Sequence, residues 1–472
     1  MGSEMCIRDS NHADHIMGAG VFAEADTPEI YAHAQLPVLT SRIFNVLRPI
    51  IYDRSMRQFG VYLTKGGLVN AGIGPQLRTN HKSTLSYRPP TQTFSDRFST
   101  LIAGVSIELI HAPGETDDTI YVWLPEQRCL ISADNIYKTF PNLYAIRGTA
   151  YRDVMQWVAS LDIIRELRPD YLIPTHGQPI RGADEIYATV TAYRDAIQFV
   201  HDQTIRLMNK GFSAEQIANQ LKLPEHLANH RYLREHYGTI SWSARAIFEG
   251  YLGWFSGNPS DLNSLAPSAR AQRMADMVGG TSALKRQAEK AAATGDHQWV
   301  LELSDHLMQL LPNDWEVRKL RTDALLAQGE RHSSSNGRNY FLASAQELNG
   351  FKLPSLVPQA DLLQNFPIDA FFQSMRVVLN PEKSADKEIQ IGFEFTDSGR
   401  SFDLHLRCGV LEVQERSAEN PDAILITSEQ TWKEIAAGLQ KPMRAVLTRQ
   451  LKVSGSIPKL LRFLRQFEPR QR

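Results

Sequence analysis

Four consecutive residues near the start of the chain, His12-Ala13-Asp14-His15, constrain it more than any other stretch. Two imidazoles and a carboxylate this close together cannot all lie on one face of a regular helix or strand. On a loop they can converge on a metal ion, because neutral imidazole and carboxylate oxygen are the ligand types of hydrolytic zinc centres. The alternative is a polar loop with two solvated histidines. Further ligands downstream would favour the metal site.

The length and composition describe a multidomain globular protein. At 472 residues the chain is too long for one hydrophobic core, and two to four domains are expected. The formal net charge of −1 gives no overall attraction to nucleic acid or to an anionic membrane, and no nucleic-acid partner is expected. The three cysteines lie far apart without Cys-x-x-Cys spacing, which excludes a disulfide framework and a thiolate zinc site. No apolar run reaches the ~18 residues that a membrane span needs.

Residues 1–10 (MGSEMCIRDS) show neither a helical nor a strand pattern and contain no apolar signal-peptide core. We expect them to be a non-native or artefactual prefix, joined to a protein whose own N-terminus is missing. On this expectation the localisation cannot be inferred, and cytoplasmic, periplasmic and secreted proteins all stay possible.

Potential ligands follow short apolar segments in the next part of the chain. The predicted strands are residues 101–105, 107–111, 119–124, 129–132 and 171–177. Glu115 lies in the turn after the second strand, Asp134 follows the fourth, and His176 lies near the end of the fifth. Residues 51–90 are rich in glycine and predict long loops around a site. Apolar residues at helical spacing predict a helix over residues 153–167.

The rest of the chain predicts a helical part and then an α+β part. Helices are expected over residues 186–210 and 213–221, followed by an aromatic-rich segment at residues 232–254. These aromatic residues fit a helical core, and the alternative is the lining of a substrate site or a subunit interface. Beyond a boundary near residues 352–354, the predicted elements are helices at 371–379, 428–440 and 457–467 and strands at 389–396, 401–408, 410–414 and 423–426.

Taken together, the candidate ligands supply enough nitrogen and carboxylate oxygen for two divalent ions. They are His12, Asp14, His15, Glu115, Asp134 and His176. Asp134 could bridge the two ions, and such a pair can hold a hydroxide at neutral pH.

At these positions the sequence resembles the metallo-β-lactamase superfamily and, within it, the alkyl sulfatases. Residues 12–15 match the later part of the superfamily's HxHxDH motif, and residues 111–115 (HAPGE) stand where many members have HxPGH. Glutamate at Glu115 is a feature of the alkyl sulfatase branch. Asp134 matches the bridging carboxylate, where these enzymes often have glutamate, and His176 matches the last histidine.

The resemblance implies an α/β catalytic domain with the αββα metallo-β-lactamase fold, two zinc ions per subunit and two further domains. The expected domains are an N-terminally incomplete catalytic domain at residues 11–190, an all-α dimerisation domain at 191–350 and a sterol-carrier-like α+β domain at 351–472. A homodimer through the helical domain is therefore expected.

The resemblance also implies a role for each site residue. His12 and Glu115 would bind the first zinc, while Asp14, His15 and His176 would bind the second. Asp134 would lie between the two ions, and Asp14 and Asp134 would be the catalytic carboxylates. The expected sulfate-binding residues are Asn142, Tyr144 and Arg147. A guanidinium fork and an amide donor suit a sulfate monoanion, and the alternative for Arg147 is a surface ion pair.

One position departs from the family's pattern. The first histidine of HxHxDH would fall at position 10, where this chain has Ser10. Because Ser10 belongs to the suspect prefix, we interpret it as a consequence of truncation. The first metal site then lacks one ligand, and we expect weakened occupancy and low activity.

The function expected from these observations is zinc-dependent hydrolysis of alkyl sulfate esters, such as dodecyl sulfate, by a metal-bound hydroxide. One alternative is another hydrolase of the same fold, such as a thioesterase, a lactonase or a phosphodiesterase. The other is a non-catalytic lipid- or surfactant-binding protein with a decayed metal site. Glu115 and the two added domains argue against the first alternative.

Overall fold

The computed structural model describes residues 5–23, 27–64, 66–75, 85–354, 365–436 and 438–468. The chain divides into two compact units, each assembled from separate stretches of sequence. The first unit comprises Met1–Pro49, Lys82–Thr93 and Ser355–Arg472, and the second comprises Ile50–His81 and Phe94–Pro354.

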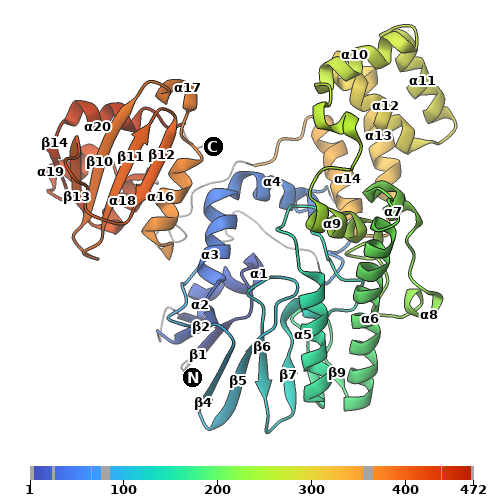
Figure 1. Ribbon diagram of the computed structural model, residues 1–472, viewed down its shortest axis with the longest axis horizontal. Helices are drawn as coiled ribbons and strands as arrows, with labels where there is room; N and C mark the ends of the chain where they lie inside the picture. The colour runs from blue at the N-terminus through green and yellow to red at the C-terminus, as the bar shows by residue number, and fades with distance from the viewer. Residues whose placement is uncertain are drawn as a thin grey trace. The chain divides into compact units, whose positions relative to one another are not determined.

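The second unit contains a six-stranded sheet with its strands in chain order, β4 to β9 (Figure 1). The strands are β4 (Arg97–Ile102), β5 (Val105–His111), β6 (Ile120–Leu124), β7 (Cys129–Ile131), β8 (Tyr171–Ile173) and β9 (Ile180–Arg181). Neighbouring strands are antiparallel except β7 and β8, which are parallel. A parallel pair needs a crossover connection, and the helix α5 (Val154–Leu167) lies within the one that joins β7 to β8.

Two long helices cover this sheet, α5 and α6 (Ala183–Met208) (Figure 1). Trp157 and Leu161 of α5 and Val190 of α6 are fully buried in one hydrophobic core with residues of the sheet. Asp153 caps the start of α5, because its carboxylate accepts hydrogen bonds from the backbone N–H groups of residues 155 and 156. Burial of this apolar face is what holds the sheet and its loops in place.

A helical part completes the second unit. Its helices are α7 (Ala214–Gln220), α8 (Glu225–Ala228), α9 (Ile240–Leu252), α10 (Pro267–Met277), α11 (Thr281–Ala293), α12 (His297–Leu310), α13 (Trp315–Arg331) and α14 (Ser335–Leu348), with a short 3-10 helix, η3 (Pro259–Asn263). Ser213 and Gln216 form the predicted capping box of α7. Leu303, Leu307 and Val317 belong to a buried cluster that packs α12 against α13.

The first unit begins with β1 (Met5–Arg8), which pairs in parallel with β2 (Glu29–His33); β3 (Gln92–Phe94) lies next to β2. The helices of this part are α1 (Ala13–Ile16), α2 (Ala19–Ala23), α3 (Leu36–Ser41) and the π-helix η1 (Arg42–Val46), after which α4 (Arg48–Gln58) begins. Ile16 and Leu36 are fully buried in a cluster that includes Tyr87 and Phe366.

The C-terminal part of the first unit is a five-stranded sheet in the order β12-β11-β10-β13-β14 (Figure 1). The strands are β10 (Glu388–Phe395), β11 (Ser401–Arg407), β12 (Val410–Gln414), β13 (Ala423–Thr427) and β14 (Leu451–Gly455). The helices are α16 (Ile368–Arg376), α17 (Pro381–Ser384), α18 (Glu429–Ala436), α19 (Pro442–Leu447) and α20 (Ile457–Leu464). Phe372, Phe393 and Phe463 are among the fully buried side chains of this core.

The structure corrects several predictions of local structure. Residues 13–16 form one turn of helix rather than a loop, since the buried Ile16 anchors that turn in the core. Met5–Arg8 is a strand although its sequence shows no strand pattern, because backbone pairing with β2 supplies its stability; residues 1–4 lie outside the described residues. The predicted long loop over residues 51–90 begins with the helix α4, which reaches Gln58.

Two further differences concern strands. The hairpin turn falls at Ala103-Gly104 rather than at residue 106, because both residues adopt positive φ (49° and 80°). The strand β14 and the helix α19 were not predicted, since their sequence mixes basic and apolar residues without a clear period. Within the described ranges, every helix is too short or too polar to cross a lipid bilayer.

Candidate metal centre

Three of the predicted ligands follow strands that end at the same edge of the six-stranded sheet. β7 and β8 are parallel, and β5 runs parallel to β7 because each is antiparallel to β6. The carboxyl ends of all three strands therefore meet at one edge. Glu115 follows β5, Asp134 follows β7 and His176 follows β8. The topology thus gathers two carboxylates and an imidazole from distant parts of the sequence.

The loop that carries Glu115 is held by Asn135. The backbone N–H of Glu115 donates to Asn135 Oδ1 (3.0 Å), and Asn135 Nδ2 donates to the carbonyl oxygen of Ala112 (2.7 Å). Glycine is required at position 114, because a Cβ there would lie 2.2 Å from Asn135 Oδ1. These hydrogen bonds fix the backbone of the loop and therefore orient the Glu115 side chain.

Glu115 is a buried carboxylate beside a buried arginine. Arg152 Nη1 donates to Glu115 Oε1 (3.1 Å) and to the carbonyl oxygen of Asn142, and both charged side chains are 3% exposed. Glu115 Oε2 has no hydrogen-bond partner among the described residues. Burial raises the pKa of the Glu115 carboxyl to about 7, and the positive charges of Arg152 and Arg147 oppose this rise. A cation at Oε2 would satisfy an oxygen that is otherwise buried without a partner.

Asp134 and His176 are in direct contact. Asp134 is buried in the 3-10 helix η2 (Ala133–Asn135), and its Oδ1 lies 2.7 Å from His176 Nδ1. Ala133 has a φ of 48°, which turns the chain sharply at the end of β7 and leaves Asp134 at the sheet edge. This contact fixes the ring of His176.

The other three ligands lie on or next to α1. His12 occupies the N-cap position, and Asp14 and His15 lie within the helical turn. The His15 side chain is 1% exposed, and its Nδ1 lies 2.7 Å from Asp9 Oδ1. A carboxylate that accepts the Nδ1 proton fixes the tautomer in which Nε2 can bind a metal.

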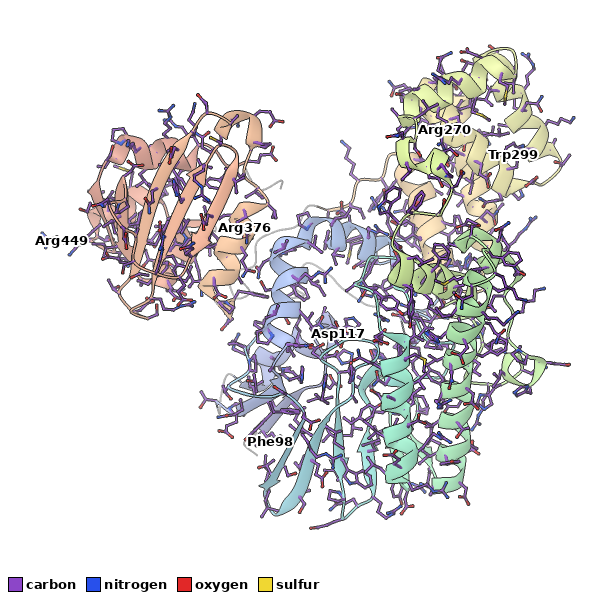
Figure 2. All side chains as sticks on the ribbon, in the orientation of Figure 1. Phe98, Asp117, Arg270, Trp299, Arg376 and Arg449 are labelled. Atoms are coloured by element: carbon purple, nitrogen blue, oxygen red, sulfur yellow. The ribbon has the colours of Figure 1, made fainter. Side chains whose placement is uncertain are left out.

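The six predicted ligands divide between the two units. His12, Asp14 and His15 lie in the first unit, and Glu115, Asp134 and His176 lie in the second. The donors are all imidazole nitrogen and carboxylate oxygen, which is a set that fits zinc and similar divalent ions. His111, at the end of β5, is not among these six, and its Nε2 lies 2.8 Å from the carbonyl oxygen of Asp117, which is labelled in Figure 2.

The predicted sulfate-binding segment is held by the end of α4. The backbone N–H of Arg147 donates to Oε1 of the fully buried Gln58 (2.8 Å), and the Arg147 guanidinium lies 6.0 Å from the ring centroid of Phe59. Asn142 is also fully buried, and neither atom of its side-chain amide has a partner among the described residues. Tyr144 is partly buried. A buried amide without a partner is a ready binding group for an anion or another polar ligand.

Sequence reasoning missed three residues that support the predicted ligands: Asp9, Asn135 and Arg152. Asp9 was set aside with the first ten residues, although its position ahead of the histidines was a usable signal. Asn135 directly follows Asp134, and a buried asparagine after a ligand often orients the next loop. Arg152 gave no signal, because its contact with Glu115 spans 37 residues and depends on the fold.

Comparison with known proteins assigns a family to each part of the chain. Residues 11–176 match the metallo-beta-lactamase superfamily, residues 213–350 match the alkyl sulfatase dimerisation family, and residues 357–471 match the alkyl sulfatase C-terminal family. A linear primary-alkylsulfatase from a Pseudomonas species is 34% identical to this chain over 97% of the chain and 90% of the relative. The chain belongs to the alkyl sulfatase family.

Two further alkyl sulfatases are similar over almost the whole chain. An (R)-specific secondary-alkylsulfatase from Pseudomonas is 28% identical, covering 98% of this chain and 72% of the relative. The solved structure of the stereoselective inverting sec-alkylsulfatase Pisa1 from Pseudomonas has a TM-score of 0.94 and 25% identity, covering all of this chain and 76% of that one. The resemblance drawn from the sequence is therefore confirmed, as is the fold class: a metallo-β-lactamase α/β domain, a helical dimerisation domain and a C-terminal α+β domain. The alkyl sulfatases are sulfuric ester hydrolases of the metallo-β-lactamase superfamily, and this member is an enzyme of that class.

Proposed function

We propose that this alkyl sulfatase family member hydrolyses alkyl sulfate esters at a centre of two zinc ions. One observation carries the proposal. Glu115 Oε2 and the Asn142 amide are buried without partners among the described residues, and Arg152 contacts both residues. The first is an oxygen suited to a cation and the second an amide suited to an ester oxygen, so a metal and an anionic ester would satisfy both.

The proposed roles of the ligands follow the resemblance to the alkyl sulfatases. His12 and Glu115 would hold the first ion, Asp14, His15 and His176 the second, and Asp134 would lie between them. When bound, two such ions make water nucleophilic at neutral pH and offset negative charge on the ester. The positive charge of the buried Arg152 favours the ionised form of Glu115 and its hydrogen bond holds the carboxylate in place, and Asp9 fixes the tautomer of His15.

The sulfate group would be bound by Arg147, Asn142 and Tyr144. A guanidinium donates two parallel hydrogen bonds to a tetrahedral anion, and the amide nitrogen of Asn142 can add a third. Since the charge of Arg147 opposes the rise that burial causes in the pKa of Glu115, it acts on the region of the proposed first metal site. An ester held there would have its sulfate beside the proposed ions.

Replacement of Arg147 tests this assignment. We expect Arg147→Leu to raise the KM for dodecyl sulfate by on the order of 10- to 100-fold, because a charge-assisted pair to sulfate is lost. The zinc content should not change. The matched control is Arg128→Leu, which removes a half-exposed surface ion pair with Asp170. Equal effects of the two replacements would mean that Arg147 only forms a surface ion pair.

A panel of esters separates the proposal from its alternatives. The zinc-loaded chain should release inorganic sulfate from dodecyl sulfate and leave a thioester, a lactone and a phosphodiester unchanged. Turnover of one of those three without sulfate release would support another metallo-β-lactamase-fold hydrolase. Binding of dodecyl sulfate without turnover would support a surfactant-binding protein. The same assay in isotopically labelled water would show whether the C–O or the S–O bond breaks.

We also infer a homodimer through the helical part of the second unit. The last turn of α9 and the segment that follows it expose several large apolar side chains: Tyr251, Leu252, Trp254, Leu262 and Leu265. Contiguous apolar surface of this kind marks subunit contacts, and the segment lies within the residues that match the dimerisation family.

Sedimentation analysis of Trp254→Ser tests this interface. We expect that variant to shift the chain towards monomer, while the control Trp315→Ser, which replaces another exposed tryptophan, should not. A dimer that is equally stable in both variants would exclude this surface as the contact.

A further inference from the structure

Residues 439–465 of the first unit combine a local excess of positive charge with exposed apolar side chains. This stretch includes α19, β14 and α20. It holds seven of the 51 basic residues of the chain and none of its 52 acidic residues. The basic residues are Lys441, Arg444, Arg449, Lys452, Lys459, Arg462 and Arg465. A nearly neutral chain therefore carries one strongly cationic segment, which we call the cationic segment.

The same segment exposes seven large apolar side chains. They are Leu439, Met443, Val446, Leu447, Ile457, Leu461 and Leu464. Leu447 is 80% exposed and Met443 71%, whereas Ala445, Leu460 and Phe463 face inwards and belong to the core. The inward side chains suffice to hold α19 and α20 on the domain, so the outward ones add nothing to its core. Exposed apolar residues gathered in this way mark a binding surface.

Among the described residues, most of these basic side chains form no ion pair. In the part that the structure describes, the guanidinium groups of Arg444, Arg449 and Arg465 form no ion pair, while Lys459 pairs with Asp422. Figure 2 labels Arg449 at an edge of the C-terminal part. A second copy seated on this face would bring like charges together, which opposes self-association. The surface is therefore complementary to a partner that is negatively charged and that also has an apolar region in which aliphatic side chains can be buried.

We propose that the cationic segment docks the protein on an anionic phospholipid bilayer. Aliphatic side chains of short amphipathic helices enter the boundary between headgroups and acyl chains, and arginine and lysine bind the phosphates above it. Nucleic acid would satisfy the charge but not the leucines, and the exposed side chains include no aromatic ring on which a base could stack. This docking does not depend on the proposed metal centre.

Co-sedimentation with vesicles tests the proposal. The full chain should bind phosphatidylcholine vesicles that contain phosphatidylserine, should not bind pure phosphatidylcholine vesicles, and should be released at high salt. The triple variant Arg444→Glu, Arg449→Glu, Arg465→Glu removes three positive charges from this surface. We expect its partition coefficient between vesicles and water to fall on the order of 100-fold, since each charge contributes about tenfold or less. Leu447→Ser with Leu461→Ser should lose about tenfold or more.

A matched control reverses three exposed charges of the second unit, Lys222→Glu, Arg286→Glu and Lys290→Glu, and should bind as the unaltered chain does. Circular dichroism of every variant establishes that the fold is kept. The proposal is overturned if the unaltered chain does not bind the anionic vesicles, if it binds both kinds of vesicle equally, or if the triple variant and the control bind alike. It is also overturned if the triple variant changes the oligomeric state in the absence of lipid, since the face would then be a subunit contact.

Discussion

Ser10 stands where the family's pattern has a histidine, next to the ligands of α1. It is buried, and its hydroxyl has no hydrogen-bond partner among the described residues. An imidazole at this position would add a second donor from this segment, after His12, to the proposed first ion.

Ser10→His should therefore tighten the binding of the first zinc ion. We expect its dissociation constant to fall about tenfold or more, as measured by competition with a chromogenic chelator. Ser10→Ala is the control and should leave both ions unaffected. If the folded Ser10→His variant binds zinc no better than the unaltered chain, Ser10 is not at a ligand position.

Arg152 is the residue on which the buried charge of Glu115 depends. Its replacement by methionine keeps the apolar stem but leaves the Glu115 carboxylate buried without a counter-charge. We expect the free energy of unfolding of the metal-free chain to fall by about 3–5 kcal/mol. Arg231→Met, which removes an exposed pair with Glu185, should cost less than about 1 kcal/mol. Calorimetry of both variants checks this, and equal losses would show that the buried pair has no special role.

At the scale of single elements, the turn between β5 and β6 depends on Gly114. An added Cβ would lie 2.2 Å from Asn135 Oδ1, which holds the backbone N–H of Glu115. We expect Gly114→Ala to cost about 1–3 kcal/mol of stability and to lower the zinc content, because the loop must move. Gly74→Ala has open space around the added atom and serves as the control. Unchanged zinc content in Gly114→Ala would mean that this loop does not carry a ligand.

The end of α13 contains a histidine whose environment makes stability depend on pH. His332 packs against Trp242 and Phe341, with ring centroids 5.6 Å and 5.8 Å away, and burial lowers its pKa below the usual value of 6.5. The unfolded chain then binds a proton more readily than the folded one. Stability is therefore kept above pH 6.5 and is lost as the pH falls below 6.5 through the folded-state pKa.

His332→Gln removes this titration. We expect the fall in melting temperature between pH 7 and pH 5.5 to be smaller in this variant than in the unaltered chain. His226→Gln replaces an exposed histidine and should keep the full fall. An identical pH dependence in all three proteins would contradict the proposed role of His332.

Some helices and strands could be predicted from the sequence and others could not. α5 and α6 were predicted within a few residues, because their apolar period and caps are local signals. β1 and β14 were missed, since their stability comes from pairing with distant strands rather than from their own pattern. The six candidate ligands were predicted from short motifs, whereas the contact of Arg152 with Glu115 was not, because only the folded chain brings the two residues together.

In the whole molecule, three segments of the chain match three different protein families. Residues 11–176 match a superfamily of metal-dependent enzymes, and the two alkyl sulfatase parts follow. The overall charge of −1 gave no hint of a membrane partner, because it averages a cationic segment with a more acidic remainder.

Sulfate release as a function of bound zinc shows whether this chain is a two-zinc alkyl sulfatase. The chain is stripped with a chelator, zinc is added back in known equivalents, and inorganic sulfate from dodecyl sulfate is measured at each step. We expect no release from the stripped chain and a maximum rate only when two equivalents are bound, with the ion of the first site bound more weakly. Full activity in the stripped chain, or no sulfate release at any zinc content in either the unaltered chain or Ser10→His, would contradict it.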